Sequence, residues 1–98
     1  MRESTIEKYL TKQVKDIGGR AYKFQSPGNA GVPDRLVLLP GGRTIFVEMK
    51  APGKKPTTLQ LSQIRKIKNL GHTAIVIDSK EGVDKFISSE TGGDAIHD

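Results

Sequence analysis

A very short connection between two apolar segments is the feature that most limits how this chain can fold. Residues 34–39 and 43–50 both have the composition of β-strands, and only Pro40, Gly41 and Gly42 separate them. So short a connection predicts that the two strands pair antiparallel as a hairpin. The remaining segments have to be arranged around this pair.

The length of the hairpin loop decides which side chains share a face of the sheet. A two-residue turn would pair Asp34 with Met49, whereas a three-residue loop would pair Asp34 with Glu48. Three-residue loops favour a type I turn followed by a left-handed residue, which Gly42 provides without strain. We therefore expect an odd-numbered loop, or a β-bulge of the same effect, that brings Asp34 and Glu48 to one face with Cβ atoms ~5 Å apart.

The other segments have the periodicity of three helices and two more strands. The first helix starts at a capping box, in which the Ser4 hydroxyl and the Glu7 side chain cap one another's backbone amides, and it ends at Gly18-Gly19. The next two helices start at the caps Thr57 and Ser79. With the first helix at 4–17, we expect helices at 57–70 and 80–87, and strands at 20–25 and 72–78.

The expected order is α-β-β-β-α-β, with the short last helix after it. The helix at 57–70 crosses between the third and fourth strands, and a helical crossover normally returns its strand parallel to the one before it. We therefore expect an α/β fold with a four-stranded mixed sheet flanked by helices. Residues 1–88 form a single domain in this interpretation, and residues 89–98 form a flexible C-terminal tail.

Composition narrows the class of function. The 98 residues include no cysteine, which excludes disulfides, thiolate zinc sites and cysteine nucleophiles and favours a cytoplasmic protein. No apolar run approaches the ~18 residues of a membrane span. Sixteen Lys and Arg against eleven Asp and Glu give a net charge of +5, which favours a polyanion such as nucleic acid as the partner. A basic surface that only keeps the protein soluble is the alternative.

Charged side chains gather where the hairpin strands end. Glu48 and Lys50 point the same way and directly follow the apolar run 45–47. Burying either charge alone is costly, but Asp34 and Glu48 can share a divalent cation, with the Met49 carbonyl as a further ligand. Such a cation polarises a phosphodiester and lowers the pKa of a bound water, which Lys50 can orient. The alternative is an exposed Glu48–Lys50 ion pair with Asp34 as a turn cap.

Four pieces of sequence form a recognisable set, namely GVPDR at 31–35, the glycines at 41–42, FVEMK at 46–50, and Gln60. This set resembles the virus-type replication-repair nuclease (VRR-NUC) domain of the PD-(D/E)xK superfamily, over roughly residues 3–78. The resemblance implies a restriction-endonuclease-like core and a stand-alone phage or bacterial form similar to Holliday-junction resolvases. It implies a structure-selective DNA endonuclease that uses Mg²⁺ or Mn²⁺, cuts four-way junctions as a homodimer, and works in the host-cell cytoplasm if a phage encodes it.

The resemblance also implies roles for individual residues. Asp34 and Glu48 match the metal ligands, and Lys50 matches the catalytic lysine. Glu7 matches a metal-binding acid of the first helix, with Glu3, one turn earlier, as its competitor and the capping box as its structural alternative. Gln60 matches a glutamine near the active site, yet it is also the last residue of a second capping box that starts at Thr57, so both roles stay open.

Polar and basic residues outside the motif are candidates for DNA contact, with a plain solvated surface as the alternative. The two histidines, His72 and His97, have no acids at metal-ligand spacing and are interpreted as structural. The DNA-contact candidates are Ser26, Asn29, Arg35, Lys54, Lys55, Arg65, Lys66 and Lys68.

Two other functions stay open on these residues. One is a flap nuclease, nicking enzyme or exonuclease on the same core, and the other is a non-catalytic basic DNA-binding module. Lys50 separates enzyme from binder, because a pure binder has no use for an amine beside two carboxylates. No helix that reads base edges is evident, so we expect little sequence preference.

Overall fold

A computed structural model of the chain describes residues 1–92. None of the helices in this part is long and apolar enough to cross a membrane. Most of the predicted tail, and His97 with it, lies outside the described residues. The elements are α1 (Glu3–Asp16), β1 (Arg20–Lys23), β2 (Arg35–Leu39), β3 (Arg43–Met49), α2 (Thr58–Asn69), β4 (Thr73–Ile77) and α3 (Lys80–Glu90).

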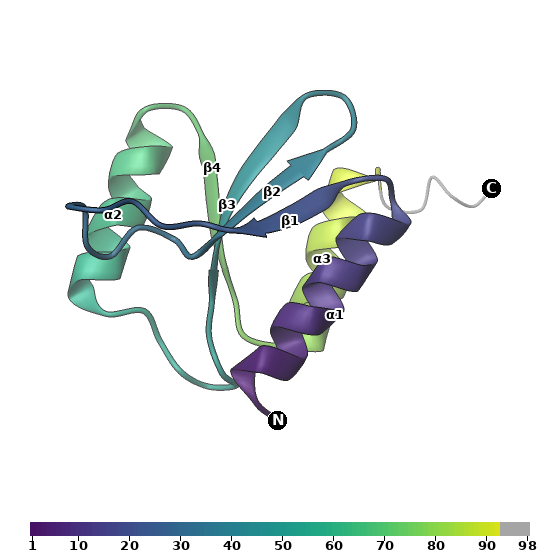
Figure 1. The fold of residues 1–98 in the computed structure, drawn as a ribbon, viewed down its shortest axis with the longest axis horizontal. Helices are drawn as coiled ribbons and strands as arrows, with labels where there is room; N and C mark the ends of the chain where they lie inside the picture. Colours follow the sequence, from purple (N-terminus) through teal and green to yellow (C-terminus); the bar gives the residue numbers. More distant parts are fainter. Residues whose placement is uncertain (93–98) are drawn as a thin grey trace.

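The strands form one mixed sheet in the order β1-β2-β3-β4 (Figure 1). β1 pairs antiparallel with β2, and β2 pairs antiparallel with β3. β4 runs parallel to β3 because α2 carries the chain back to the start of the sheet between them. The predicted α/β fold with a four-stranded mixed sheet is confirmed.

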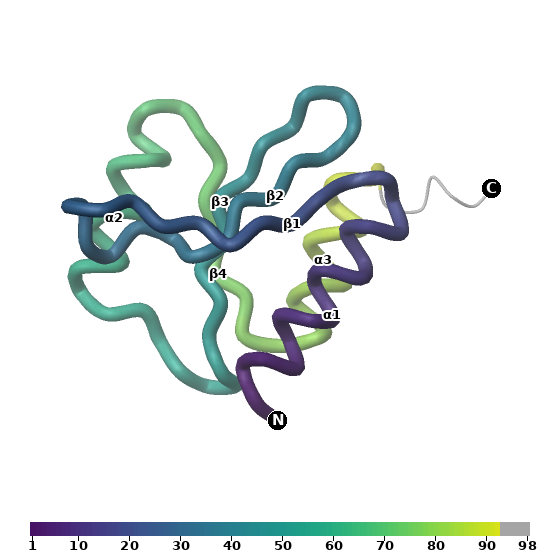
Figure 2. The backbone as a smooth tube through the Cα atoms, in the orientation of Figure 1, coloured from purple at the N-terminus to yellow at the C-terminus, as the bar shows by residue number. Residues whose placement is uncertain are grey.

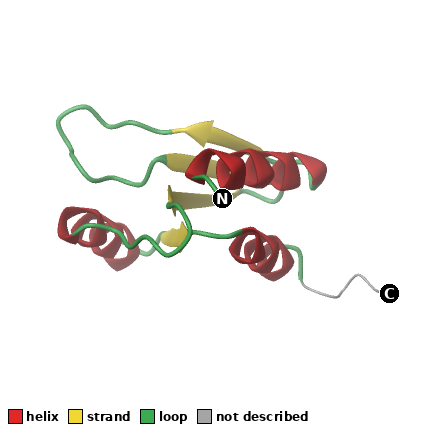
Figure 3. Ribbon diagram, turned by 90° about the horizontal axis from the view of Figure 1, so that it is seen from below, coloured by secondary structure: helices red, strands yellow, loops and turns green. Residues whose placement is uncertain are grey.

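The helices cover the two faces of the sheet unequally. α1 and α3 lie together on one face, and α2 lies on the other (Figures 1 and 3). The path of the backbone in Figure 2 shows α1 and α3 side by side, and the Tyr9 hydroxyl donates a hydrogen bond of 2.6 Å to Asp84 between them. The core lies under this helix pair, where the α1 stripe of Ile6, Leu10 and Val14 is fully buried against the sheet.

The hairpin has the predicted three-residue loop. Leu39 pairs with Arg43 and Arg35 pairs with Val47, with no bulge between these pairs. The predicted type I turn is wrong, because φ is +85° at Gly41 and +81° at Gly42, and a type I turn over residues 40 and 41 needs a negative φ at Gly41. Two successive left-handed residues suit two glycines, and the register that follows from the loop length is unchanged.

Two helix ends differ from the sequence prediction. α1 starts one residue early, with Arg2 at the N-cap and no side-chain cap, so Ser4 and Glu7 form no capping box. The Glu7 carboxylate instead pairs with Arg35 of β2. α3 continues to Glu90, past both its predicted end at Ile87 and the predicted domain boundary at residue 88, because Arg43 holds Glu90 through two hydrogen bonds of 2.8 Å.

Candidate active site

Acidic side chains from α1 and from the start of β2 meet at one end of the sheet. Glu3 and Glu7 lie one turn apart on α1, so they share a helix face, and Asp34 directly precedes β2. One carboxylate oxygen from each of these three residues lies within 4.8 Å of the others. The sequence left open whether Glu3 or Glu7 is the acid of the site. In the structure both lie close to Asp34.

Asp34 is held in place by the strand next to it. Its Oδ1 accepts a hydrogen bond of 3.0 Å from the backbone N–H of Met49. Continuing the hairpin register by one residue sets Asp34 opposite Glu48, as the three-residue loop requires. The carboxylate of Asp34 therefore sits between the helix acids and the end of β3.

Glu48 and Lys50 lie at the end of β3 as a buried pair. The Lys50 Nζ is 3.4 Å from the Glu48 Oε2, and the Glu48 side chain is only 4% exposed. Burial raises the pKa of Glu48, and the negative charge of Asp34 raises it further, while Lys50 lowers it. The simple alternative of an exposed surface ion pair therefore does not describe Glu48.

The pKa of Glu3 is also raised, by burial and by nearby negative charge. Burial raises the pKa of Glu3 first, and the neighbouring carboxyls of Glu7 and Asp34 raise it further, while Lys50 lowers it. Besides burial, the raised pKa values of Glu3 and Glu48 share one cause, the negative charge of neighbouring carboxylates, which a bound cation would offset.

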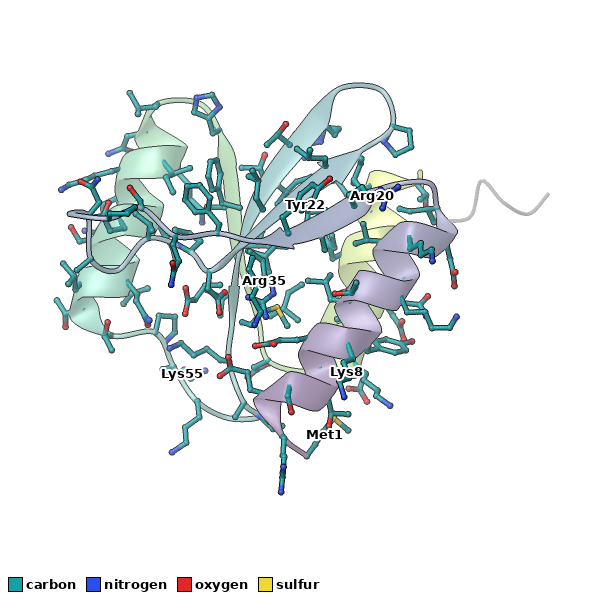
Figure 4. All side chains as sticks on the ribbon, in the orientation of Figure 1. Met1, Lys8, Arg20, Tyr22, Arg35 and Lys55 are labelled. Atoms are coloured by element: carbon teal, nitrogen blue, oxygen red, sulfur yellow. The ribbon has the colours of Figure 1, made fainter. Side chains whose placement is uncertain are left out.

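Arg35 is the second cation in contact with this cluster. Its side chain is 8% exposed and pairs with Glu7, and its Nη1 donates a hydrogen bond of 3.0 Å to the carbonyl of Asp34. The predicted contact of Arg35 with DNA is therefore corrected. Arg35 alternates with Val37 and Leu39 on the face that α1 covers, so its guanidinium is turned inward (Figure 4). That alternation was the available sequence signal for an inward-facing arginine.

The donor set fits a hard divalent cation. The carboxylates of Glu3, Glu7 and Asp34 lie together, and Glu48 is close enough for the charges of Asp34 and Glu3 to raise its pKa further. Mg²⁺ and Mn²⁺ prefer oxygen ligands of this kind. Met49 is buried at the end of β3, and its backbone N–H binds Asp34. Glu3, Glu7, Asp34 and Glu48 are thus the residues available to hold a metal.

The other predicted site residues make contacts of their own. Gln60 is engaged in the predicted capping box, because its Oε1 accepts from the Thr57 N–H at 2.9 Å and its own N–H donates to the Thr57 hydroxyl at 3.1 Å. Ser26 and Asn29 hold each other through a hydrogen bond of 2.9 Å in the loop before β2. The exposed basic residues of α2 and of the loop before it remain candidates for DNA contact, namely Lys54, Lys55, Arg65, Lys66 and Lys68.

Comparison with known proteins gives a consistent result. No family model matches the chain. A protein named "Putative nuclease p44" from Acyrthosiphon pisum secondary endosymbiont phage 1 is 58% identical over 81 residues, which are 83% of this chain and 87% of that protein. A solved structure described as "VRR_NUC domain" superposes with a TM-score of 0.83 at 34% identity, over 88% of this chain and 94% of the other. A second, a "VRR_NUC domain protein", shares the fold with a TM-score of 0.68 at 18% identity, over 100% of this chain and 92% of the other.

Proposed function

Because this chain belongs to the VRR-NUC family of nuclease domains, we propose that it is a divalent-metal-dependent DNA endonuclease that cuts branched DNA, above all four-way junctions, as a homodimer. The observation that carries the proposal is the group of three carboxylates at one end of the sheet, with the Glu48–Lys50 ion pair near it. Phosphodiester hydrolysis needs a way to neutralise the phosphate and a positioned water, and this set of residues is suited to both.

Each residue has a distinct part in this chemistry. Glu3, Glu7, Asp34 and Glu48 would hold Mg²⁺ or Mn²⁺, with the Met49 carbonyl as a further ligand. A bound ion of this type polarises the phosphodiester and lowers the pKa of a coordinated water. The Met49 N–H fixes the Asp34 carboxylate, so the acid is positioned before substrate arrives.

Lys50 acts on the phosphate and the attacking water. Its side chain is 17% exposed, so the ammonium can reach a bound phosphate while it stays next to Glu48. There it donates hydrogen bonds to a non-bridging oxygen, where negative charge grows in the transition state, or to the water that attacks. Gln60, at the start of α2, keeps its amide N–H₂ group for the same phosphate while its oxygen caps the helix.

The uncovered face of the sheet supports the homodimer. Tyr22, Leu36 and Phe46 form a row across β1, β2 and β3 on the face opposite α1. α2 packs on β4 and leaves this row open, so Tyr22 is 52% exposed and the neighbouring Leu38 is 38% exposed. A second copy on this face would bury these apolar side chains, and a twofold dimer suits the two symmetric phosphates of a four-way junction.

Cleavage of end-labelled four-way junction, flap, nicked duplex, plain duplex and single strand tests the activity, each with Mg²⁺, Mn²⁺ or EDTA. Asp34→Asn and Glu48→Gln should each abolish cleavage and keep junction binding, while Glu81→Gln, which changes an exposed acid on α3, should cleave normally. Preferred cleavage of the flap or the nicked duplex would contradict the junction proposal and favour a flap or nicking nuclease. Binding without any metal-dependent cleavage would leave only a DNA-binding module.

Sedimentation velocity tests the dimer. The wild type should sediment as a dimer at micromolar concentration, and the exposed-face variant Tyr22→Ser/Leu38→Ser should sediment as a folded monomer that no longer resolves junctions. A stable wild-type monomer would contradict the junction proposal and leave the nuclease chemistry intact.

A further inference from the structure

Four lysines that the proposed chemistry does not use line a groove beside α1. The groove lies between α1 and β1 and has a volume of about 730 Å³. Lys8, Lys12 and Lys15 line it from α1, and Lys23 lines it from β1. We call these residues and the space between them the α1–β1 groove.

The lysines of α1 form a regular row. Lys8, Lys12 and Lys15 follow the i, i+4, i+7 pattern, so they share one side of the helix, while Ile6, Leu10 and Val14 are buried on another. Lys8 and Lys15 are ~10 Å apart along the axis, at ~1.5 Å of rise per residue. A row of this length can contact neighbouring phosphates of one DNA strand.

The positive charge of this row is largely available. Among the described residues, Lys12 alone of the four has an acidic partner, Asp16, at 2.8 Å, and both members of that pair are well exposed. An exposed pair of this kind adds little stability, so a phosphate can compete with Asp16 for Lys12. None of the DNA-contact candidates predicted from the sequence lies on α1.

The groove leads directly to the acidic cluster. A neighbouring cleft of about 450 Å³ is lined by Glu7, Lys23 and Arg35, which also line the groove, and by Asp34. The two hollows therefore join at Glu7. Figure 4 labels Lys8 on α1 and Arg35 near the centre of the molecule, and both line the groove.

We infer that the α1–β1 groove binds the phosphate backbone of a single DNA strand next to the phosphate that is cut. The inference deepens the proposed function and rests on it. The groove lies between two neighbouring elements, α1 and β1, and its α1 lysines form a single row along it, which suits one strand. Lysines attract the phosphates along the groove, and the acids at its inner end repel them unless a metal is bound. The strand is thereby guided to stop with one phosphate at the metal site.

The first test measures binding in EDTA, so that it does not depend on cleavage. Lys8→Gln/Lys15→Gln removes two charges from the groove, and Arg20→Gln/Lys85→Gln removes two exposed charges elsewhere. The groove variant should bind a labelled single strand more weakly, and its slope of log affinity against log salt should be smaller by ~1 per lysine. An unchanged slope, or the same change in the control variant, would overturn the inference.

The second test locates the strand. The natural chain has no cysteine, so Lys8→Cys and Lys15→Cys each introduce a unique thiol that can be crosslinked to DNA carrying a thiol tether at one chosen phosphate. Lys8→Cys should react closest to the cleavage position, and Lys15→Cys should react further along the same strand. Crosslinking no stronger than that of Arg20→Cys would overturn the inference. If the two variants crosslink in the expected order but the protein does not cleave DNA, the nuclease proposal is contradicted and the groove inference stands.

Discussion

Replacement of Arg35 by methionine tests how the acidic cluster is held together. Methionine keeps much of the apolar stem of arginine but removes the charge, so Glu7 is left among other carboxylates without its partner. Loss of one member of a buried ion pair costs ~3–5 kcal/mol. The Glu7 side chain keeps 23% exposure, which places the expected loss near the lower end, at about 3 kcal/mol.

That loss is large for a chain of this size. The free energy of unfolding of a domain of about 100 residues is ~5–15 kcal/mol. A loss of about 1 kcal/mol lowers its Tm by ~4–8 °C. Arg35→Met should therefore melt ~12–24 °C below the wild type in EDTA. Urea unfolding followed by circular dichroism gives the free energy directly, with Arg20→Met, an exposed arginine of β1, as the matched control.

Two further measurements separate the charge effect from a packing effect. Glu7→Gln/Arg35→Met should recover most of the stability, because the amide no longer carries an unpaired charge. Saturating Mg²⁺ should stabilise Arg35→Met, by ~2.7 kcal/mol at a hundred times the dissociation constant. If Arg35→Met loses less than about 1 kcal/mol, or if the double variant is as unstable as Arg35→Met, the ion pair does not hold the cluster together.

Three other changes test the remaining parts of the structure. Lys50→Met should lower the single-turnover rate by ~10²–10³-fold without weakening junction binding, and a near-normal rate would remove Lys50 from the chemistry. Deletion of Gly41 should leave a two-residue turn that moves the acids of β2 and β3 to opposite faces, so Mg²⁺-induced stabilisation should vanish in thermal melts. Because Arg43 lowers the pKa of Glu90, that carboxylate stabilises the folded state above its usual pKa of 4.5, and the contribution disappears as pH falls through the lowered value. Glu90→Gln should therefore melt below the wild type at neutral pH and together with it at about pH 3, and a constant gap would contradict the pair.

The fold was predictable where the local pattern leaves one choice. Hairpin parity is such a case, because a change of one residue in the loop moves every side chain to the other face. The two capping boxes show the limit. Thr57 and Gln60 form theirs, since nothing else in the described fold takes the Gln60 oxygen, whereas Glu7 is drawn away from Ser4 by Arg35, a partner distant in sequence.

The candidate site was predictable in its residue types and less so in its arrangement. The spacing of Asp34, Glu48 and Lys50 follows from strand geometry, and the two α1 acids follow from helical spacing. Arg35 was predicted to contact DNA, but it pairs with Glu7 because α1 covers β2. No local sequence pattern predicts that packing. The end of α3 at Glu90 likewise depends on Arg43 from another element.

The packing of α1 on α3 has a consequence for how the protein is made. Both α1 acids sit on a helix whose apolar stripe is covered partly by Val83 and Phe86 of α3, and Lys80 of α3 lies 5.2 Å from the centre of the Tyr9 ring. During translation α1, the hairpin and β4 all leave the ribosome before α3 does. We expect α1 to dock firmly only after α3 has emerged, so a growing chain carries the acids of the hairpin without those of the helix.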